Sequence, residues 1–219
     1  MKPDTAPQAL LATIDADTML REVQDWAAIN TGTGNIAGLD RMARILADAF
    51  STLPGDVELV EPATVTAISP EGREYEKPHG KHMVLRVRPE ADRRFVLTGH
   101  MDTVFPEDHP FQQVSWLDDD TINGPGTADM KGGLCVILHA LRAFEASGNA
   151  DRLGYDVMIN SDEETGSLAS RTLIEELARG KYAALTYEPS ALPDGTLAHA
   201  RGGTGNYAIT ITISIKTKT

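Results

Sequence analysis

Segments typical of β-strands alternate with segments typical of helices along most of this chain, and this order constrains the fold more than any other feature. The helical segments carry apolar residues at helical spacing, and two of them end at a glycine, Gly148 or Gly180. We expect helices over residues 17–30, 38–50, 132–148 and 167–180, and strands over residues 56–68, 82–89, 94–100, 155–162 and 182–189. Such alternation predicts an α/β fold, with three α/β/α layers around a mostly parallel central sheet.

The composition narrows the class of protein. The 219 residues carry 32 acidic and 20 basic side chains, a net charge of −12, and show no basic face, which argues against a nucleic-acid partner. No apolar run is long enough to cross a membrane, and the first ten residues lack the order of a signal peptide. We therefore expect a cytoplasmic protein, or a periplasmic or secreted one if a leader was removed. The single cysteine, Cys135, lies in an apolar run, where a buried, inert thiol is expected rather than a nucleophile.

Polar side chains follow the expected strands where each strand ends. His100 and Asp102 are two residues apart at the end of one strand, so their side chains face the same side. Asp102 could accept the Nδ1 proton of His100 and leave Nε2 free for a metal ion, although a surface histidine beside an acid has the same sequence. Asp129 lies between glycines in "NGPGTADMKGG", which indicates either a carboxylate placed by a tightly turned backbone or an ordinary loop.

Two further acidic stretches also follow expected strands. Glu163 and Glu164 are adjacent and so point apart, which would let one bind a cation while the other handles a proton. The alternative is a helix N-terminus with acidic residues in its first turn, but this accounts poorly for three consecutive acids. Glu188 precedes a proline, so it is either a turn residue or another oxygen ligand.

These groups are expected to converge, because ligands bind at the carboxyl ends of the strands in open α/β sheets. Several carboxylates gathered there without a cation would raise one another's pKa strongly, and a divalent metal ion resolves that conflict. Nitrogen and carboxylate ligands without a thiolate suit Zn²⁺, with Co²⁺ or Mn²⁺ as alternatives. The ligands are too many for one tetrahedral ion, so we expect two ions bridged by one carboxylate.

The stretches "GHMDTVF", "GPGTADMKGG", "DEETGS" and "YEPS", in this order and spacing, resemble the dinuclear zinc peptidases and deacylases. That family includes glutamate carboxypeptidase, acetylornithine deacetylase, succinyl-diaminopimelate desuccinylase and aminoacylase, and the glutamate carboxypeptidase branch is the most similar. The resemblance implies that His100 and Glu188 hold one Zn²⁺, that Glu164 holds the other, and that Asp129 bridges both and forms a cis peptide bond with Met130.

The same resemblance implies a reaction. Glu163 would be the general base, taking a proton from a water molecule and passing it to the leaving amine, while Asp102 would orient His100. The substrate would be a peptide or an N-acyl amino acid, and cleavage of its amide bond would release an amino acid. A serine hydrolase is excluded because the sequence lacks a G-x-S-x-G motif.

The chain departs from the family pattern at its end. Residues 1–204 would be a partial catalytic domain, and residues 205–219 the first strand of a truncated lid and dimerisation domain that is otherwise absent. We therefore expect this chain to bind metal incompletely and to turn over poorly, whereas a full-length form would be a homodimer through its lid. A non-catalytic metal-binding fragment and an N-acyl-amino-acid deacylase of the same family remain as alternatives.

Overall fold

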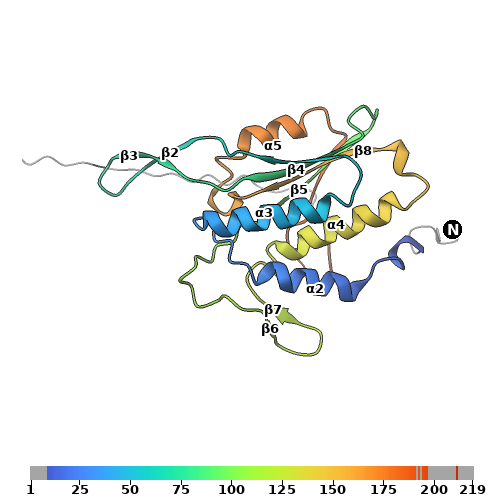
Figure 1. Ribbon diagram of the computed structural model, residues 1–219, viewed down its shortest axis with the longest axis horizontal. Helices are drawn as coiled ribbons and strands as arrows, with labels where there is room; N and C mark the ends of the chain where they lie inside the picture. Colours follow the sequence, from blue (N-terminus) through green and yellow to red (C-terminus); the bar gives the residue numbers. More distant parts are fainter. Residues whose placement is uncertain (1–8, 191, 193, 197–210, 212–219) are drawn as a thin grey trace, which may run out of the picture.

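A five-stranded sheet forms the centre of the protein (Figure 1). The computed structural model describes residues 9–190, 192, 194–196 and 211. The strands lie in the order β1 (Asp56–Val60), β4 (His82–Val87), β8 (Gly154–Asn160), β5 (Arg94–His100) and β9 (Ala183–Thr186). β8, β5 and β9 are parallel, while β4 runs antiparallel to both of its neighbours, so four of these five strands point the same way. The predicted α/β fold with a mostly parallel sheet is confirmed.

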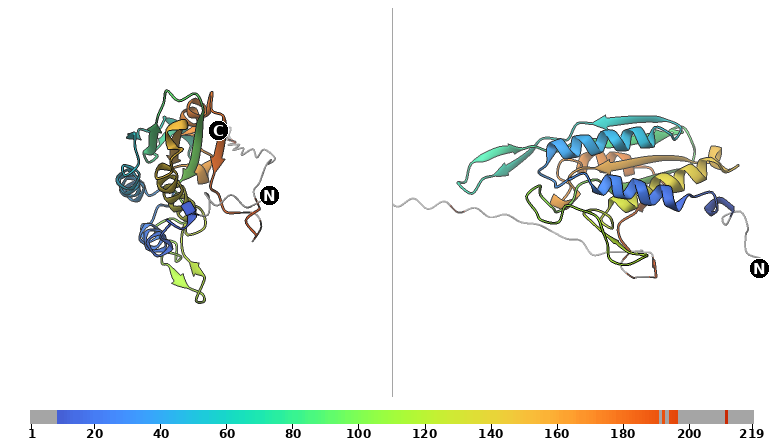
Figure 2. Two further views of the ribbon diagram at one scale, coloured as in Figure 1. Left: turned by 90° about the vertical axis from the view of Figure 1, so that its right-hand side faces the viewer. Right: turned by 60° about the horizontal axis from the view of Figure 1, so that its bottom comes forward.

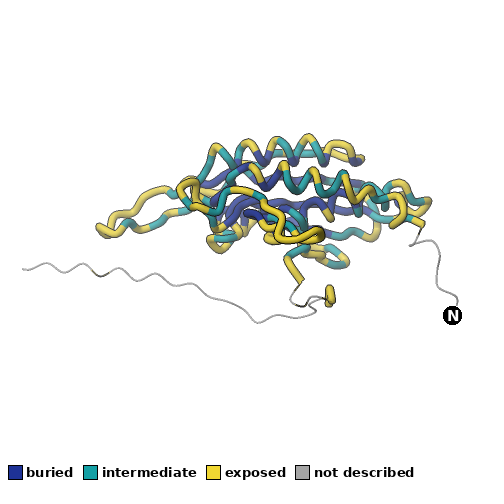
Figure 3. The backbone as a smooth tube through the Cα atoms, turned by 90° about the horizontal axis from the view of Figure 1, so that it is seen from below, coloured by how far each residue is buried: buried dark blue, intermediate teal, exposed yellow. Residues whose placement is uncertain are grey.

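Helices cover both faces of this sheet. α3 (Ile36–Phe50) and α4 (Lys131–Glu145) pack on one face, with α2 (Ala16–Ala27) against α4, and α5 (Arg171–Ala178) covers the other face. The end-on view in Figure 2 shows α2, α3 and α4 together on one side. Every residue of β8 is buried, as a central strand covered on both faces requires, and the buried layer runs through the middle of the molecule in Figure 3.

Side-chain caps fix where the first two of these helices begin. The carboxylate of Asp15 accepts hydrogen bonds from the backbone N–H groups of Asp17 (3.0 Å) and Thr18 (3.2 Å) at the start of α2. The side chain of Asn35 accepts one from the backbone N–H of Gly38 (2.9 Å) at the start of α3. Each cap satisfies backbone donors that a helix leaves unpaired at its N-terminus, which stabilises a helix by about 1 kcal/mol.

The expected strand over 56–68 is in fact two strands. After β1, the chain passes Pro62 and leaves the sheet, and β2 (Val65–Ile68) pairs with β3 (Glu74–Lys77) in a separate, largely exposed hairpin. Proline lacks the N–H that a continued ladder needs, which explains the break. The polar strand β3 and the short hairpin of β6 (Ser115–Trp116) and β7 (Ile122–Asn123) were not predicted.

The expected helix over 167–180 begins later, at Arg171, because a short 3₁₀ turn over Glu163–Thr165 and a loop precede it. The predicted boundary at residue 205 and the strand over 205–219 fall almost wholly outside the described residues. Within the part of the chain that the structure describes, no helix is both long enough and apolar enough to span a membrane.

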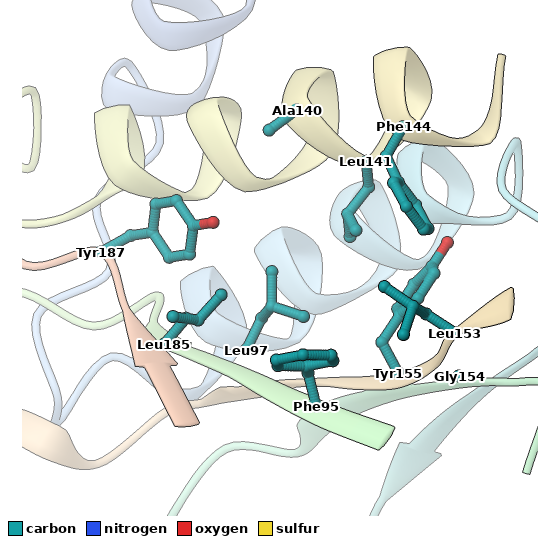
Figure 4. A pocket seen from close by; sticks show the side chains of 10 residues that line it. All are labelled: Phe95, Leu97, Ala140, Leu141, Phe144, Leu153, Gly154, Tyr155, Leu185 and Tyr187. Atoms are coloured by element: carbon teal, nitrogen blue, oxygen red, sulfur yellow. The ribbon is translucent and has the colours of Figure 1, made fainter. Parts of the chain in front are cut away.

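An apolar cavity of about 280 Å³ lies between α4 and the sheet, over β5 and the edge strand β9 (Figure 4). Phe95, Leu97 and Leu185 from the sheet face Leu141 and Phe144 from α4 across it. No charged side chain lines this cavity, so it has none of the acid, base or metal-binding groups that the sequence predicts. Those groups lie at the ends of the strands instead.

Candidate metal centre

The predicted site residues meet at one edge of the sheet because three parallel strands end there. His100 is the last residue of β5 and pairs in register with Asn160, the last residue of β8. β9 ends at Thr186, two residues before Glu188. Gly99 allows α4 to approach this edge, since a Cβ there would collide with the side chains of Met130 and Leu134. That close approach brings Asp129, two residues before α4, to the end of β5.

The imidazole of His100 is the centre of this group. Its Nε2 atom lies 2.9 Å from Oδ1 of Asp129 and 3.7 Å from Oε2 of Glu188. One ligand atom each from His100, Asp129 and Glu164 lie within 4.8 Å of one another. We call His100, Asp129, Glu164 and Glu188 the strand-end cluster. All four are side chains that the sequence analysis assigned to metal binding.

Asp102 has a wider set of contacts than the sequence suggested. Nδ1 of His100 lies 3.0 Å from the backbone oxygen of Asp102 and 3.4 Å from its carboxylate, so Nδ1 carries the hydrogen and Nε2 faces Asp129. The buried carboxylate also accepts hydrogen bonds from the backbone N–H groups of Glu163 (3.2 Å) and Glu164 (3.2 Å), and from the hydroxyl of Thr33 (2.8 Å). Asp102 therefore positions the histidine and both glutamates at once.

Asp162 is a structural residue of the site that the sequence analysis did not single out. Its buried carboxylate accepts hydrogen bonds from the backbone N–H groups of Ala169 (2.7 Å) and Ser170 (3.3 Å), at the far end of the loop that carries the two glutamates. Gly166 takes a left-handed conformation, with φ of 93°, where the loop turns. The sequence contained a signal for this role, because Asp162 is the first of three consecutive acidic residues and only two of the three can face a shared ligand.

The loop before α4 holds Asp129 in place. The peptide bond between Asp129 and Met130 is cis, as the resemblance implied. Met130 is fully buried, and the backbone N–H of Lys131 donates to the carbonyl of Gly126 (2.7 Å). The buried Nζ of Lys131 donates to the carbonyl of Ile29 (2.8 Å), and burial lowers the pKa of this lysine to about 7. Lys131 thus ties the loop to the end of α2, a role that the sequence did not indicate.

The electrostatics of the strand-end cluster favour an added positive charge. Burial acts to lower the pKa of His100, but the hydrogen bonds and charges of Asp102 and Glu188 outweigh it and raise the pKa to about 11. Burial and the neighbouring carboxylates raise the pKa of Glu164 to about 7, and they raise the pKa of Glu163 as well, although His100 opposes both shifts. Without a cation, these side chains would retain protons because several carboxylates lie close together with little solvent to screen their repulsion.

A divalent metal ion fits this donor set. The ligand atoms are one imidazole nitrogen and carboxylate oxygens, a combination that suits Zn²⁺, Co²⁺ or Mn²⁺. Among the described histidines, only His100 belongs to the strand-end cluster. His139 pairs with Glu22, and His109 accepts a hydrogen bond from the backbone of Phe111. His199 lies outside the described residues.

Comparisons with known proteins identify the family of this chain. Residues 96–216 match the model of peptidase family M20/M25/M40, which covers more than half of the chain. The chain is 28% identical over 201 residues to carboxypeptidase G2 from Pseudomonas sp. (strain RS-16), an alignment covering 92% of this chain and 46% of that protein. It is 31% identical over 146 residues to acetylornithine deacetylase from Vibrio vulnificus, covering 63% of this chain and 32% of that protein.

The fold has relatives among solved structures. Human carnosine dipeptidase 1 superposes with a TM-score of 0.66 at 19% identity, over 85% of this chain and 42% of that one. The chain spans about half or less of the length of these relatives. The family match begins within β5 and includes α4, β8 and β9, so all four residues of the strand-end cluster lie inside it. The chain belongs to peptidase family M20/M25/M40.

Proposed function

We propose that this chain forms the metal-binding part of a zinc-dependent hydrolase that cleaves an amide or peptide bond and releases an amino acid. One observation carries the proposal: ligand atoms of His100, Asp129 and Glu164 lie within 4.8 Å of one another, and Glu163 directly precedes Glu164 in the 3₁₀ turn after β8. A site that only bound metal would have no need for a second carboxylate beside its ligands.

Four residues would hold the metal ions. His100 and Glu188 would bind one Zn²⁺, Glu164 the other, and Asp129 both. When bound, the ions would supply Lewis acidity toward the scissile carbonyl and would make a water molecule more acidic. The Nδ1–H of His100 is already engaged with Asp102, which keeps Nε2 directed at Asp129 and at the ion.

Glu163 would move the proton. Its carboxylate would accept a proton from the attacking water and then donate it to the nitrogen of the leaving amine as the C–N bond breaks. Its backbone N–H is held by the carboxylate of Asp102, so the start of the 3₁₀ turn that carries it is fixed relative to His100. Positioning of this kind is what a general base requires.

The substrate class follows from the relatives. Carboxypeptidase G2, acetylornithine deacetylase and carnosine dipeptidase 1 carry names of enzymes that cleave peptide or N-acyl bonds. We infer a small peptide or N-acyl amino acid as the substrate, with carboxypeptidase-like cleavage favoured. A cytoplasmic location, the absence of nucleic-acid and membrane partners, and a homodimer in a longer form belong to the same proposal.

The test combines metal analysis with a substrate screen. The purified chain and a longer version would be loaded with Zn²⁺ and assayed against dipeptides and N-acyl amino acids, with bound metal counted in each. We expect metal binding by both and slower turnover by the 219-residue chain. Glu163→Gln should reduce kcat by about 100-fold or more without loss of metal. Unchanged turnover in this variant would refute the assigned base, and metal binding without hydrolysis of any substrate by either version would favour a non-catalytic role.

A further inference from the structure

A second group of metal-binding side chains lies between α2 and α4. Glu22 projects from α2, while Cys135 and His139 project from α4. Cys135 and His139 are four residues apart, so they lie on the same face of α4, one turn from each other. We call these three residues the interhelical cluster. The predicted burial of Cys135 is confirmed, but the strand-end cluster uses none of the three.

The distances within the interhelical cluster are close to those of a tetrahedral zinc site. One ligand atom from each residue lies within 4.8 Å of the other two. Oε2 of Glu22 is 3.5 Å from Sγ of Cys135 and 2.7 Å from Nε2 of His139. Ordinary Zn–S and Zn–O bond lengths place sulfur about 3.5 Å from oxygen, and nitrogen about 3.3 Å from oxygen. On the same bond lengths, the histidine nitrogen and the glutamate oxygen would need to separate by roughly half an ångström.

The burial and charges of the cluster suit a metal ion with one open position. Cys135 is fully buried and the side chain of His139 is nearly so, whereas the side chain of Glu22 is 25% exposed and borders solvent. Arg142 lies 3.5 Å from Oε1 of Glu22, so the other oxygen, Oε2, faces the thiol and the imidazole. Arg142 also approaches Nε2 of His139 (3.4 Å) and donates to the hydroxyl of Thr52 (3.2 Å), so binding of an ion at Nε2 would require its partly exposed side chain to move outward.

We propose that Glu22, Cys135 and His139 bind one borderline divalent ion such as Zn²⁺, with water in the fourth position, and thereby link α2 to α4. The set of one thiolate, one imidazole and one carboxylate favours such an ion over Mg²⁺ or Ca²⁺. Binding forms a metal–sulfur bond and releases the thiol proton to solvent. Burial and the nearby Glu22 raise the pKa of Cys135 to about 12, so the metal-free thiol is protonated and the ion must displace that proton.

Cobalt provides a test that separates this cluster from the strand-end cluster. Cys135 is the only cysteine in the sequence, so any thiolate-to-cobalt charge-transfer band must come from the interhelical cluster. The strand-end cluster has nitrogen and oxygen ligands and gives only the weaker visible bands of Co²⁺. We expect the near-ultraviolet band when Co²⁺ is titrated into the full chain, and its loss in Cys135→Ser. This readout is independent of hydrolytic activity.

Two further variants keep the test decisive if Cys135→Ser does not fold. His139→Asn and Glu22→Gln should each weaken the Co²⁺ affinity, measured from the intensity of the band, about 100-fold. Removing a residue that only orients a ligand costs about 10-fold to 100-fold in affinity, and removing a ligand itself should cost at least as much. His109→Asn, a change of the same type outside both clusters, should leave the band unchanged. The proposal is overturned if wild-type protein binds Co²⁺ without the band, or if His139→Asn shows the band with unaltered affinity.

Discussion

Asp102→Asn is the most direct test of how the site is held together. The carboxylate accepts one backbone N–H with each oxygen, from Glu163 and from Glu164, and Oδ2 also accepts the hydroxyl of Thr33. An asparagine has only one side-chain oxygen, so in either orientation its amide faces one of the two N–H groups. Leaving a buried donor unpaired costs about 1–3 kcal/mol, and because these donors are only partly buried we expect about 1–2 kcal/mol.

The same substitution should weaken metal binding. Residues that orient ligands typically contribute 10-fold to 100-fold in affinity, and Asp102 contacts both His100 and the segment that carries Glu164. Urea unfolding of the chelator-treated protein would measure the loss of stability, and a competition titration with Zn²⁺ the loss of affinity. Asp108→Asn, which removes one negative charge from an exposed loop, is the matched control. If Asp102→Asn and Asp108→Asn have the same free energy of unfolding and the same Zn²⁺ affinity, the positioning role of Asp102 is wrong.

Two further predictions concern ionisable groups: one is the pH dependence of stability and the other is the effect of removing a buried carboxylate. In metal-free protein, Glu164 keeps its proton up to about pH 7 when folded but releases it near its ordinary pKa of 4.5 when unfolded, and the pKa of His100 is raised from 6.5 to about 11. Stability should therefore fall as the pH rises from about 5 to about 8 with a chelator present, whereas Zn²⁺ should reverse that slope in thermal unfolding, because its ligands must be deprotonated. Asp156→Ala would remove a buried carboxylate from Arg94 (2.8 Å), whose side chain is 25% exposed, and from Lys181 (2.6 Å), whose side chain is 6% exposed, so we expect a loss of about 3 kcal/mol in urea unfolding. A loss below about 1 kcal/mol would show that water replaces the carboxylate.

The sequence predicts the sheet well because burial on two faces leaves a strong pattern. β8 is buried along its whole length and appears as an uninterrupted apolar run, and α3 buries residues at helical spacing. The predicted helix and strand boundaries are wrong where tertiary contacts outweigh the conformational preference of the local sequence. The start of α5 is displaced because Asp162 binds the backbone of Ala169 and Ser170, and nothing in the local pattern reports that contact. β3 is largely exposed and polar, so it has no apolar period to detect.

Three of the four proposed metal-binding residues, His100, Glu164 and Glu188, could be placed together because each lies at or just after the end of a strand, and parallel strands bring their ends together. The order of the strands could not be found in this way. β8 lies between β4 and β5, which are consecutive in the chain, so the residue that pairs with His100 is Asn160, sixty positions later. Pairing of this kind depends on which strand is most apolar on both faces, a comparison across the whole fold.

The acidic residues of the site divide into two kinds by burial rather than by sequence. Asp102 and Asp162 are fully buried and satisfy their charge with backbone N–H groups, which are fixed donors and need no counter-ion. Asp129 is more than half exposed and, like Glu164, has no such set of backbone donors among the described hydrogen bonds. An Asp in a strand-end loop can take either role, and only the position of the neighbouring backbone decides which. The buried pair, Asp102 and Asp162, therefore stabilises the loops whether or not metal is present, while the exposed Asp129 and the partly buried Glu164 leave charge that a cation must balance.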